Sequence, residues 1–342
     1  MNLKEIGNKA RELAKGSCRV CPTCDGRVCS GEVPGMGGCG SGVSFRNNIS
    51  ALAELNLNTR LIHNVRHPGL KCQALGFDLS FPLLVGPVGG LAFNLAGAMS
   101  EEGYQAAVCD GAARAGIIAG TPDAVPPEVM HIGLDCIKKH GGRAIPFIKP
   151  WEPADFEAKI EMCAQAGCRA VACDLDSIGL ITLRQMGHPA YAKEKSELAA
   201  MIEMAHKRNM KIIIKGIMIP EDALAAQEAG ADGIVVSNHG GRVLDQAPGA
   251  ARVLPQIAAA VKGKMALLAD GGIRSGVDIL KMLALGAEAV FIGRPLTIAA
   301  IGGGAEGVEL LINTYKAQLE QAMIMTGCPD VSKAGLQLLY GR

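Results

Sequence analysis

Eight short apolar segments recur along this chain, and each is followed by a segment rich in Ala, Glu, Lys and Leu. The apolar segments cover residues 82–86, 116–120, 144–148, 170–175, 211–215, 233–237, 265–269 and 289–293. Nearly continuous apolar strands that alternate with amphipathic helices indicate a parallel sheet buried on both faces. Eight such units predict an α/β fold, a closed (β/α)8 TIM barrel, whose active site is built from loops at the carboxyl ends of the strands.

An open, doubly wound sheet is the structural alternative to the barrel. No G-x-G-x-x-G follows the first predicted strand, so the dinucleotide-binding fingerprint of that alternative is missing. We expect the barrel to occupy residues 46–342 and to follow an N-terminal helical and cysteine-rich extension over residues 1–45. Apolar residues at helical spacing predict a surface helix over residues 3–15.

Ionisable residues stand at the ends of two predicted strands. Lys215 follows three isoleucines, and a lysine in a core is costly, so it either reaches solvent or neutralises a bound anion. The strand over residues 233–237 leads into S-N-H-G-G-R. In this motif His239 can take a proton near neutral pH, and Arg242 can hold a carboxylate through two hydrogen bonds. The motif suits chemistry on a carboxylate-bearing substrate, whereas a capped strand with a surface arginine is the simpler alternative.

The last two predicted strands end in glycine-rich loops that each carry an arginine. The loops read A-D-G-G-I-R (Ala269–Arg274) and I-G-R-P (Ile292–Pro295). Glycine leaves backbone N–H groups open to a phosphate, and barrels commonly bind phosphate after strands seven and eight. A phosphorylated ligand is therefore predicted there, and its identity is open on this pattern alone.

Together, these motifs resemble the FMN-dependent 2-hydroxy-acid oxidases and dehydrogenases, such as the glycolate and lactate oxidases. The resemblance continues through Leu75–Val88, Leu283–Pro295 and Met325–Cys328, and spans residues 45–335. It implies FMN as the cofactor. The cofactor-binding residues that it implies are Pro87, Val88, Gly89, Lys215, Ser237, Asp270, Gly271, Gly272, Arg274, Gly293 and Arg294.

The resemblance also implies roles in catalysis. His239 would be the base, Arg242 would hold the substrate carboxylate, and Lys215 would stabilise negative charge on the reduced flavin. Asp176 matches the family's aspartate that orients this histidine, and a carboxylate there favours the protonated imidazole. Asp176 as a mere helix cap is the alternative. Arg184 is the nearest candidate for a second substrate arginine.

The chain departs from the family in its tyrosines. The family usually has one active-site tyrosine in the N-terminal segment and one after strand three, and none of the four tyrosines here stands at those places. The strand-three position reads P-F-I-K-P (Pro146–Pro150), without the usual glutamine and tyrosine. Asp174 stands where the family often has threonine. The resemblance therefore supports flavin binding more strongly than it defines the substrate.

Five of the twelve cysteines crowd into the N-terminal segment. Cys18, Cys21, Cys24 and Cys29 follow the spacing C-x2-C-x2-C-x4-C, and Cys39 lies further on as a substitute ligand. Soft thiolates at these gaps suit an iron–sulfur cluster or zinc. Reduced thiols with a redox or structural role are the alternative. The seven dispersed cysteines are expected to pack in the core.

Charge and hydropathy exclude some classes of partner. The net charge is +1 and no basic stripe with interleaved aromatics occurs, so we expect no nucleic-acid partner. We also expect no membrane association and a cytoplasmic location, because the N-terminus lacks an apolar signal core. The protein is further expected to be a homo-oligomer.

The sequence thus predicts an FMN-dependent oxidoreductase that converts a small (S)-2-hydroxy acid, similar to lactate or glycolate, into the 2-oxo acid. The electron acceptor is either oxygen or a redox protein. Two alternatives remain: a flavin-dependent isomerase-like barrel without net oxidation, and a non-catalytic flavin or metal redox sensor.

Overall fold

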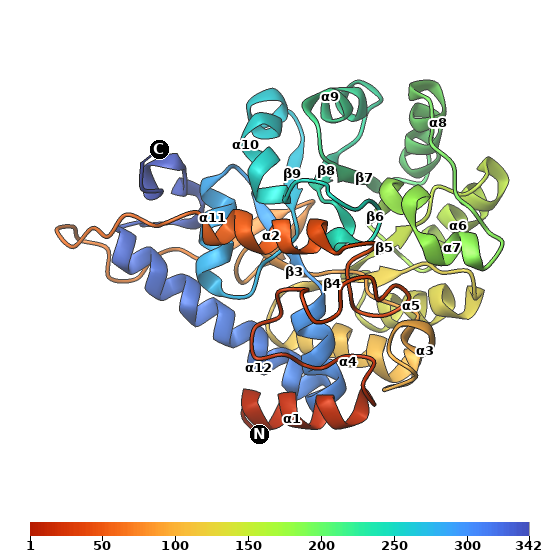
Figure 1. Ribbon diagram of the computed structural model, residues 1–342. Coiled ribbons are helices and arrows are strands. Elements are labelled where there is room, and N and C mark those ends of the chain that lie inside the picture. The colour runs from red at the N-terminus through yellow and green to blue at the C-terminus, as the bar shows by residue number, and fades with distance from the viewer. Residues whose placement is uncertain (342) are drawn as a thin grey trace.

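The computed structural model describes residues 1–341 and contains a closed barrel of eight parallel strands (Figure 1). The strands are β3 (Leu83–Val85), β4 (Ile118–Pro122), β5 (Ala144–Ile148), β6 (Ala170–Asp174), β7 (Lys211–Ile217), β8 (Gly233–Val236), β9 (Ala266–Ala269) and β10 (Ala289–Ile292). They pair in chain order, and β10 closes the barrel on β3. The predicted (β/α)8 barrel is confirmed, with small differences at the strand ends.

Helices surround the barrel, as the strand–helix alternation predicts (Figure 1). They are α3 (Leu91–Asn94), α4 (Glu101–Arg114), α5 (Pro127–Lys139), α6 (Pro153–Gln165), α8 (Lys195–His206), α9 (Pro220–Glu228), α10 (Ala250–Val261), α11 (Gly276–Ala284) and α12 (Arg294–Thr326). Two short 3-10 helices, η3 (Val331–Lys333) and η4 (Leu336–Leu338), follow α12.

The barrel interior is filled by side chains. Phe147 on β5 and Phe291 on β10 meet edge to face, with ring centroids 5.4 Å apart, although their strands are not neighbours. Such a contact has to cross the interior, so the barrel is a packed core rather than a pore. The site must therefore form above this layer, at the strands' carboxyl ends.

The N-terminal segment packs against the barrel. Helix α1 (Leu3–Leu13) lies against α12, where a Cβ on Gly302 would stand 2.0 Å from the Ile6 carbonyl oxygen. Helix α2 (Val43–Ala53) lies beside α10 at the mouth (Figure 1). A hairpin of β1 (Cys72–Ala74) and β2 (Phe77–Leu79) precedes the first barrel strand.

Helix α12 is long and apolar enough to cross a membrane by length and composition alone. It is interrupted at Gly304, whose φ is +57°, and it packs against α1, α4 and α11. These contacts give it the place of the last barrel helix.

The segment between β6 and α8 contains short helices. The 3-10 helix η1 (Leu175–Gly179) leads into α7 (Ile181–Gln185), and both lie at the carboxyl end of β6. Leu180, Leu183 and Ala190 form a small apolar cluster of their own there.

Candidate active site

The turn after β8 fixes the predicted base at the barrel mouth. The 3-10 helix η2 (His239–Gly241) has left-handed φ values of +56°, +62° and +81° along its three residues. The Ser237 hydroxyl accepts a hydrogen bond from the His239 N–H at 3.0 Å. A Cβ on Gly241 would lie 2.4 Å from the Phe45 nitrogen, so only glycine allows α2 to approach this turn.

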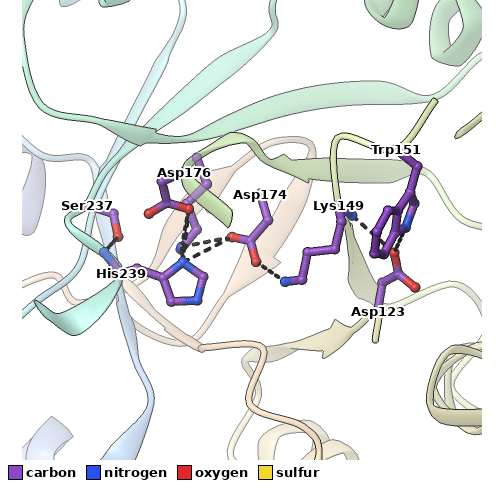
Figure 2. Close-up of polar contacts among 8 residues, drawn as sticks. Asp123, Lys149, Trp151, Asp174, Asp176, Ser237 and His239 are labelled. Atoms are coloured by element: carbon purple, nitrogen blue, oxygen red, sulfur yellow. Dashed lines mark hydrogen bonds and ion pairs between the residues drawn. The ribbon is translucent and has the colours of Figure 1, made fainter. Parts of the chain in front are cut away.

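The imidazole of His239 lies between a carboxylate and an ammonium group (Figure 2). Its Nδ1 is 2.9 Å from Asp176 Oδ1 and 3.1 Å from Lys215 Nζ. Nδ1 can either donate to Asp176 or accept from Lys215, but not both. Because Lys215 already has Asp174 and Asp176 as acceptors, we assign a proton to Nδ1 that is donated to Asp176. The other ring nitrogen, Nε2, then carries a free lone pair and can act as a base.

Lys215 is fixed in its charged form. It belongs to β7, is 4% exposed, and donates to Asp174 Oδ1 at 2.8 Å and to Asp176 Oδ1 at 3.4 Å. Burial opposes the charge, but the two carboxylates outweigh burial and raise the pKa of Lys215 above its ordinary value. The next residue, Gly216, permits this packing, because a Cβ there would stand 2.3 Å from Asp176 Cβ.

Asp176 is an ionised carboxylate, and one of its two oxygens has no hydrogen-bond partner among the described residues. Burial favours its neutral form, but Lys215 and His239 together lower the pKa of Asp176. Its second oxygen, Oδ2, is buried and makes no hydrogen bond within residues 1–341. The predicted pairing of Asp176 with His239 is therefore present in the structure, with one acceptor atom left over.

Arg242 lies at the same mouth and meets the N-terminal segment. Its guanidinium donates to the carbonyl oxygens of Gly35 and Gly37 and, at 2.9 Å, to Asn94 Oδ1. No carboxylate among the described residues lies within ion-pair distance of it. Burial lowers the pKa of Arg242. An anion arriving at this position would balance the buried charge.

Two further arginines lie beside Arg242 without a carboxylate partner in residues 1–341. Arg294 donates to the Met36 carbonyl oxygen at 2.8 Å and lies over the ring of Phe45, and Arg274 donates to the Cys24 carbonyl oxygen at 3.1 Å. Burial, and then the neighbouring guanidinium groups, lower the pKa of Arg294. Three uncompensated cations in one place make a strong anion-binding region.

The predicted flavin-binding residues fit a phosphorylated, hydroxylated ligand. Asp270 is partly buried beyond β9, and its buried Oδ1 has no hydrogen-bond partner in the described chain. Burial raises the pKa of Asp270, although Lys215 opposes that shift. The N–H groups of Gly271 and Gly272 make no backbone hydrogen bond within residues 1–341. These orphaned groups, beside Arg274 and Arg294, match the hydroxyls and phosphate of FMN.

The flavin-ring side of this region is lined by backbone. Pro87, Val88 and Gly89 follow β3 in a turn in which the Val88 N–H donates to the Gly86 carbonyl at 3.0 Å. A Cβ on Gly293, after β10, would lie 3.3 Å from a methyl group of Val88. The loops after the first and last barrel strands therefore come together, as a bound flavin requires.

Two charged residues at the mouth were not assigned a role from the sequence. Lys149 directly follows β5, and its Nζ donates to Asp174 Oδ2 at 2.5 Å (Figure 2). The signal was available, because Lys149 follows an apolar strand in the same way as Lys215 does. Both residues are buried, and the pair joins the network around His239.

Arg184 is not brought into this network. It lies on α7, is exposed, and its Nη2 donates to the Ile178 carbonyl oxygen at 3.4 Å. A substrate role for Arg184 stays a prediction.

The four N-terminal cysteines lie in one partly buried loop region but do not form a compact site. In residues 1–341, the group of possible ligand atoms that lie within 4.8 Å of one another is Asp174, Asp176 and His239, and it contains no cysteine. Lysine ammonium groups already pair with those two carboxylates. Tetrahedral zinc requires sulfur atoms within about 4 Å of one another, so the cysteines are not arranged for a single zinc ion. All twelve cysteines are free thiols, and six of the seven dispersed ones are buried as expected.

Known proteins resemble this chain over most of its length. A family profile described as FMN-dependent dehydrogenase matches residues 35–188 and 182–340. The L-lactate oxidase of Lactobacillus jensenii is 30% identical over 311 residues, which cover 84% of this chain and 76% of that protein. An L-lactate dehydrogenase of Xanthomonas campestris pv. campestris (strain B100) is 54% identical over 122 residues, which cover 36% of this chain and 32% of the dehydrogenase. A solved structure of a mandelate oxidase mutant with a C4a-OH-FMN adduct has a TM-score of 0.76 and 27% identity, and covers 98% of each chain.

Proposed function

This chain belongs to the FMN-dependent dehydrogenase family, and we propose that it oxidises a small (S)-2-hydroxy acid to the 2-oxo acid. One observation carries the proposal: His239, Asp176 and Lys215 meet at the barrel mouth, beside an Arg242 that has no carboxylate partner among the described residues. This arrangement offers a base, its orienting carboxylate, and separate cations for two anions.

The residues divide the reaction between them. Arg242 binds the substrate carboxylate, which orients the 2-hydroxyl group toward His239. His239 Nε2 accepts the hydroxyl proton, and Asp176 stabilises the imidazolium that forms. Bound FMN supplies the acceptor for the hydride that leaves Cα, so the substrate loses two electrons and two hydrogens. Asp270, Arg274 and Arg294 would hold the ribityl and phosphate groups, and Lys215 would balance negative charge near the flavin ring.

The substrate class rests on the relatives as well as on the site. They include L-lactate oxidases, (S)-2-hydroxyacid oxidases and a mandelate oxidase. A lactate-like or glycolate-like acid is the substrate that we propose, with oxygen or a redox protein as the acceptor. The test is to incubate the holoenzyme with a panel of (S)- and (R)-hydroxy acids and an artificial acceptor, and to measure the 2-oxo acid formed. Formation from (S) acids alone supports the proposal, and no product from any of them contradicts it.

The two alternative functions fit the site less well. An isomerase-like barrel has no use for a base poised beside a carboxylate-binding arginine, and a sensor has no use for either. Both alternatives predict no 2-oxo acid in the same experiment, so a single measurement separates them from the oxidation.

We further propose that the cysteines of residues 18–29 hold an iron–sulfur cluster rather than a single zinc ion. Four thiols lie within twelve residues of the chain, and Arg274 Nη2 is 3.5 Å from Cys24 Sγ. A cluster of several irons holds its cysteines further apart than one ion does. Such a cluster would give electrons a route from the flavin to a redox protein.

Metal analysis of anaerobically purified protein tests the cluster. Iron and acid-labile sulfide in equal amounts, lost in Cys21→Ser but kept in Cys72→Ser, are the expected result. Cys72 is the matched control because it is also partly exposed and lies outside the segment. Zinc alone, or no metal, contradicts the cluster.

We also propose a cytoplasmic homo-oligomer. Leu61 and Ile62 are 71% and 92% exposed in the segment between α2 and β1. Apolar side chains this exposed favour association between copies. Light scattering after size-exclusion chromatography measures the mass, and a monomer would contradict the proposal.

A further inference from the structure

The buried ion pair of Lys149 and Asp174 has no part in the reaction proposed above. Lys149 follows β5 and Asp174 ends β6, two neighbouring strands, so both side chains stand at the same edge of the barrel. Their side chains are 10% and 2% exposed, and Lys149 Nζ lies 2.5 Å from Asp174 Oδ2. A buried ion pair is seldom kept for stability alone, because desolvation offsets the attraction.

Asp174 links this pair to the catalytic group. Its other oxygen, Oδ1, accepts from Lys215 Nζ at 2.8 Å and lies 3.9 Å from His239 Nδ1 (Figure 2). Asp174 and Lys215 are also register partners on β6 and β7. The order of charged groups along the mouth is therefore Lys149, Asp174, Lys215, then Asp176 with His239.

The charges of this row sum to zero when His239 is neutral. Asp176 alone would balance Lys215, so Asp174 adds one negative charge in excess. Lys149 supplies the missing positive charge. Each residue of the pair accounts for the presence of the other. Without Lys149, Asp174 would cancel the positive field of Lys215. Without Asp174, Lys149 would be a buried charge with no partner.

The pair is held rigidly in place. Asp123 Oδ2 accepts from the Lys149 backbone N–H at 3.1 Å and from Trp151 Nε1 at 2.6 Å, and Asp123 Oδ1 accepts from Lys159 Nζ at 2.7 Å. These bonds fix the backbone from which the Lys149 side chain extends, so its ammonium group cannot easily leave Asp174.

We propose that Lys149 and Asp174 are a matched pair of positioning residues: Asp174 orients Lys215, and Lys149 cancels the charge that Asp174 would otherwise impose on Lys215 and His239. This inference rests on the proposed function, because it assigns the pair to the field at the flavin and at the base. The charged groups that face His239 are Asp174 from β6, Asp176 from η1 and Lys215 from β7, with Asp270 further off after β9. Burial opposes ionisation of Asp174, but Lys149 and Lys215 together hold its pKa well below the ordinary value, so the row is fully charged.

A double-variant cycle of charge-neutralising substitutions tests the pair with Lys149→Met, Asp174→Asn and the double variant. The midpoint potential of bound FMN is the first readout. Reduction adds negative charge to the flavin, so the potential responds to nearby charges, and the measurement needs no substrate. We expect the potential to fall in Lys149→Met, to rise in Asp174→Asn, and to return close to the wild-type value in the double variant. Lys139→Met is the control, since it removes a lysine that pairs with Asp110 on α4, away from the row.

The pH profile is the second readout. The acid limb of kcat/KM should move to higher pH in Lys149→Met and to lower pH in Asp174→Asn, and the second shift should be the larger, because Asp174 lies 3.9 Å from the imidazole and Lys149 lies beyond it. A structural role predicts instead that both single variants lose activity without opposite shifts, and that the double variant is no better.

These measurements distinguish a failure of the proposed pairing from a failure of the proposed function. If the midpoint potential shifts in the same direction in Lys149→Met and Asp174→Asn, or does not shift in Asp174→Asn, the pairing is refuted whatever the substrate is. Opposite shifts of the potential without turnover of any hydroxy acid keep the pairing and refute the proposed function. If Lys149→Met does not fold, the Asp174→Asn shift and the recovery in the double variant still decide the matter.

Discussion

Replacing Asp176 by asparagine removes the charge that stabilises His239 when the base takes a proton. Asp176 Oδ1 lies 2.9 Å from His239 Nδ1, and two unit charges at that distance interact by about 6 kcal/mol at an effective dielectric constant of about 20. Asparagine keeps a neutral hydrogen bond, and Asp174, 3.9 Å from the same nitrogen, supplies part of the field. A loss of about 3–4 kcal/mol remains, which lowers kcat/KM about 10²–10³-fold.

The assay is steady-state oxidation of the best (S)-2-hydroxy acid, with the FMN content of each variant measured first. The matched control is Asp110→Asn, because Asp110 forms an equivalent bond of 2.8 Å to His140 Nε2 between α4 and the end of α5, away from the mouth. That control should keep wild-type kcat/KM. An Asp176→Asn enzyme with full FMN content and kcat/KM within threefold of the wild type would refute the role of Asp176.

Two further substitutions and one pH series test other parts of the site. Arg242→Lys should raise KM and lower kcat/KM about 10–100-fold, because one ammonium group cannot reproduce the two-bond grip on a carboxylate; unchanged KM contradicts this role. Arg274→Met should weaken FMN binding about 10–100-fold in a fluorescence titration, since a charged hydrogen bond to phosphate is lost, and equal affinity would place the phosphate elsewhere. Burial opposes ionisation of Asp174, but its lysine partners hold its pKa in the folded protein below the ordinary value of 3.8. The ionised carboxylate therefore stabilises the fold above pH 3.8, and this stabilisation is lost as the pH falls through the lowered pKa of the folded protein. Melting temperature should therefore drop more steeply in the wild type than in Asp174→Asn between about pH 4 and pH 2, and parallel curves would show that Asp174 is not ionised.

The barrel and the central catalytic residues could be predicted because both follow from local pattern. Apolar runs and helices recur with a regular spacing, and residues that end parallel strands, such as Lys215 and His239, necessarily meet at one edge. Asp176 was found in the same way, since it stands two residues after the buried Asp174 at the end of β6.

Other contacts could not be predicted, because they join distant segments without any sequence period. The carbonyl oxygens of Gly35 and Gly37 meet Arg242 across more than 200 residues, and nothing in a glycine-rich loop specifies that docking. Arg184 was proposed from proximity in sequence, but α7 places it on the exposed side of the insertion. Lys149 was overlooked although it follows an apolar strand as Lys215 does, because its partner Asp174 stands on another strand and nothing local in the sequence joins the two.

Anaerobic reduction of the bound flavin by substrate tests the central claim most directly. The holoenzyme is mixed with (S)-lactate or glycolate without oxygen, and the visible absorbance of the flavin is followed with time, in parallel with His239→Gln and with (R)-lactate. The account predicts rapid bleaching by the (S) acid, about 10²–10⁴-fold slower bleaching in His239→Gln, and none with the (R) acid. Bleaching of His239→Gln at the wild-type rate, or a flavin that no (S)-2-hydroxy acid reduces, would contradict it.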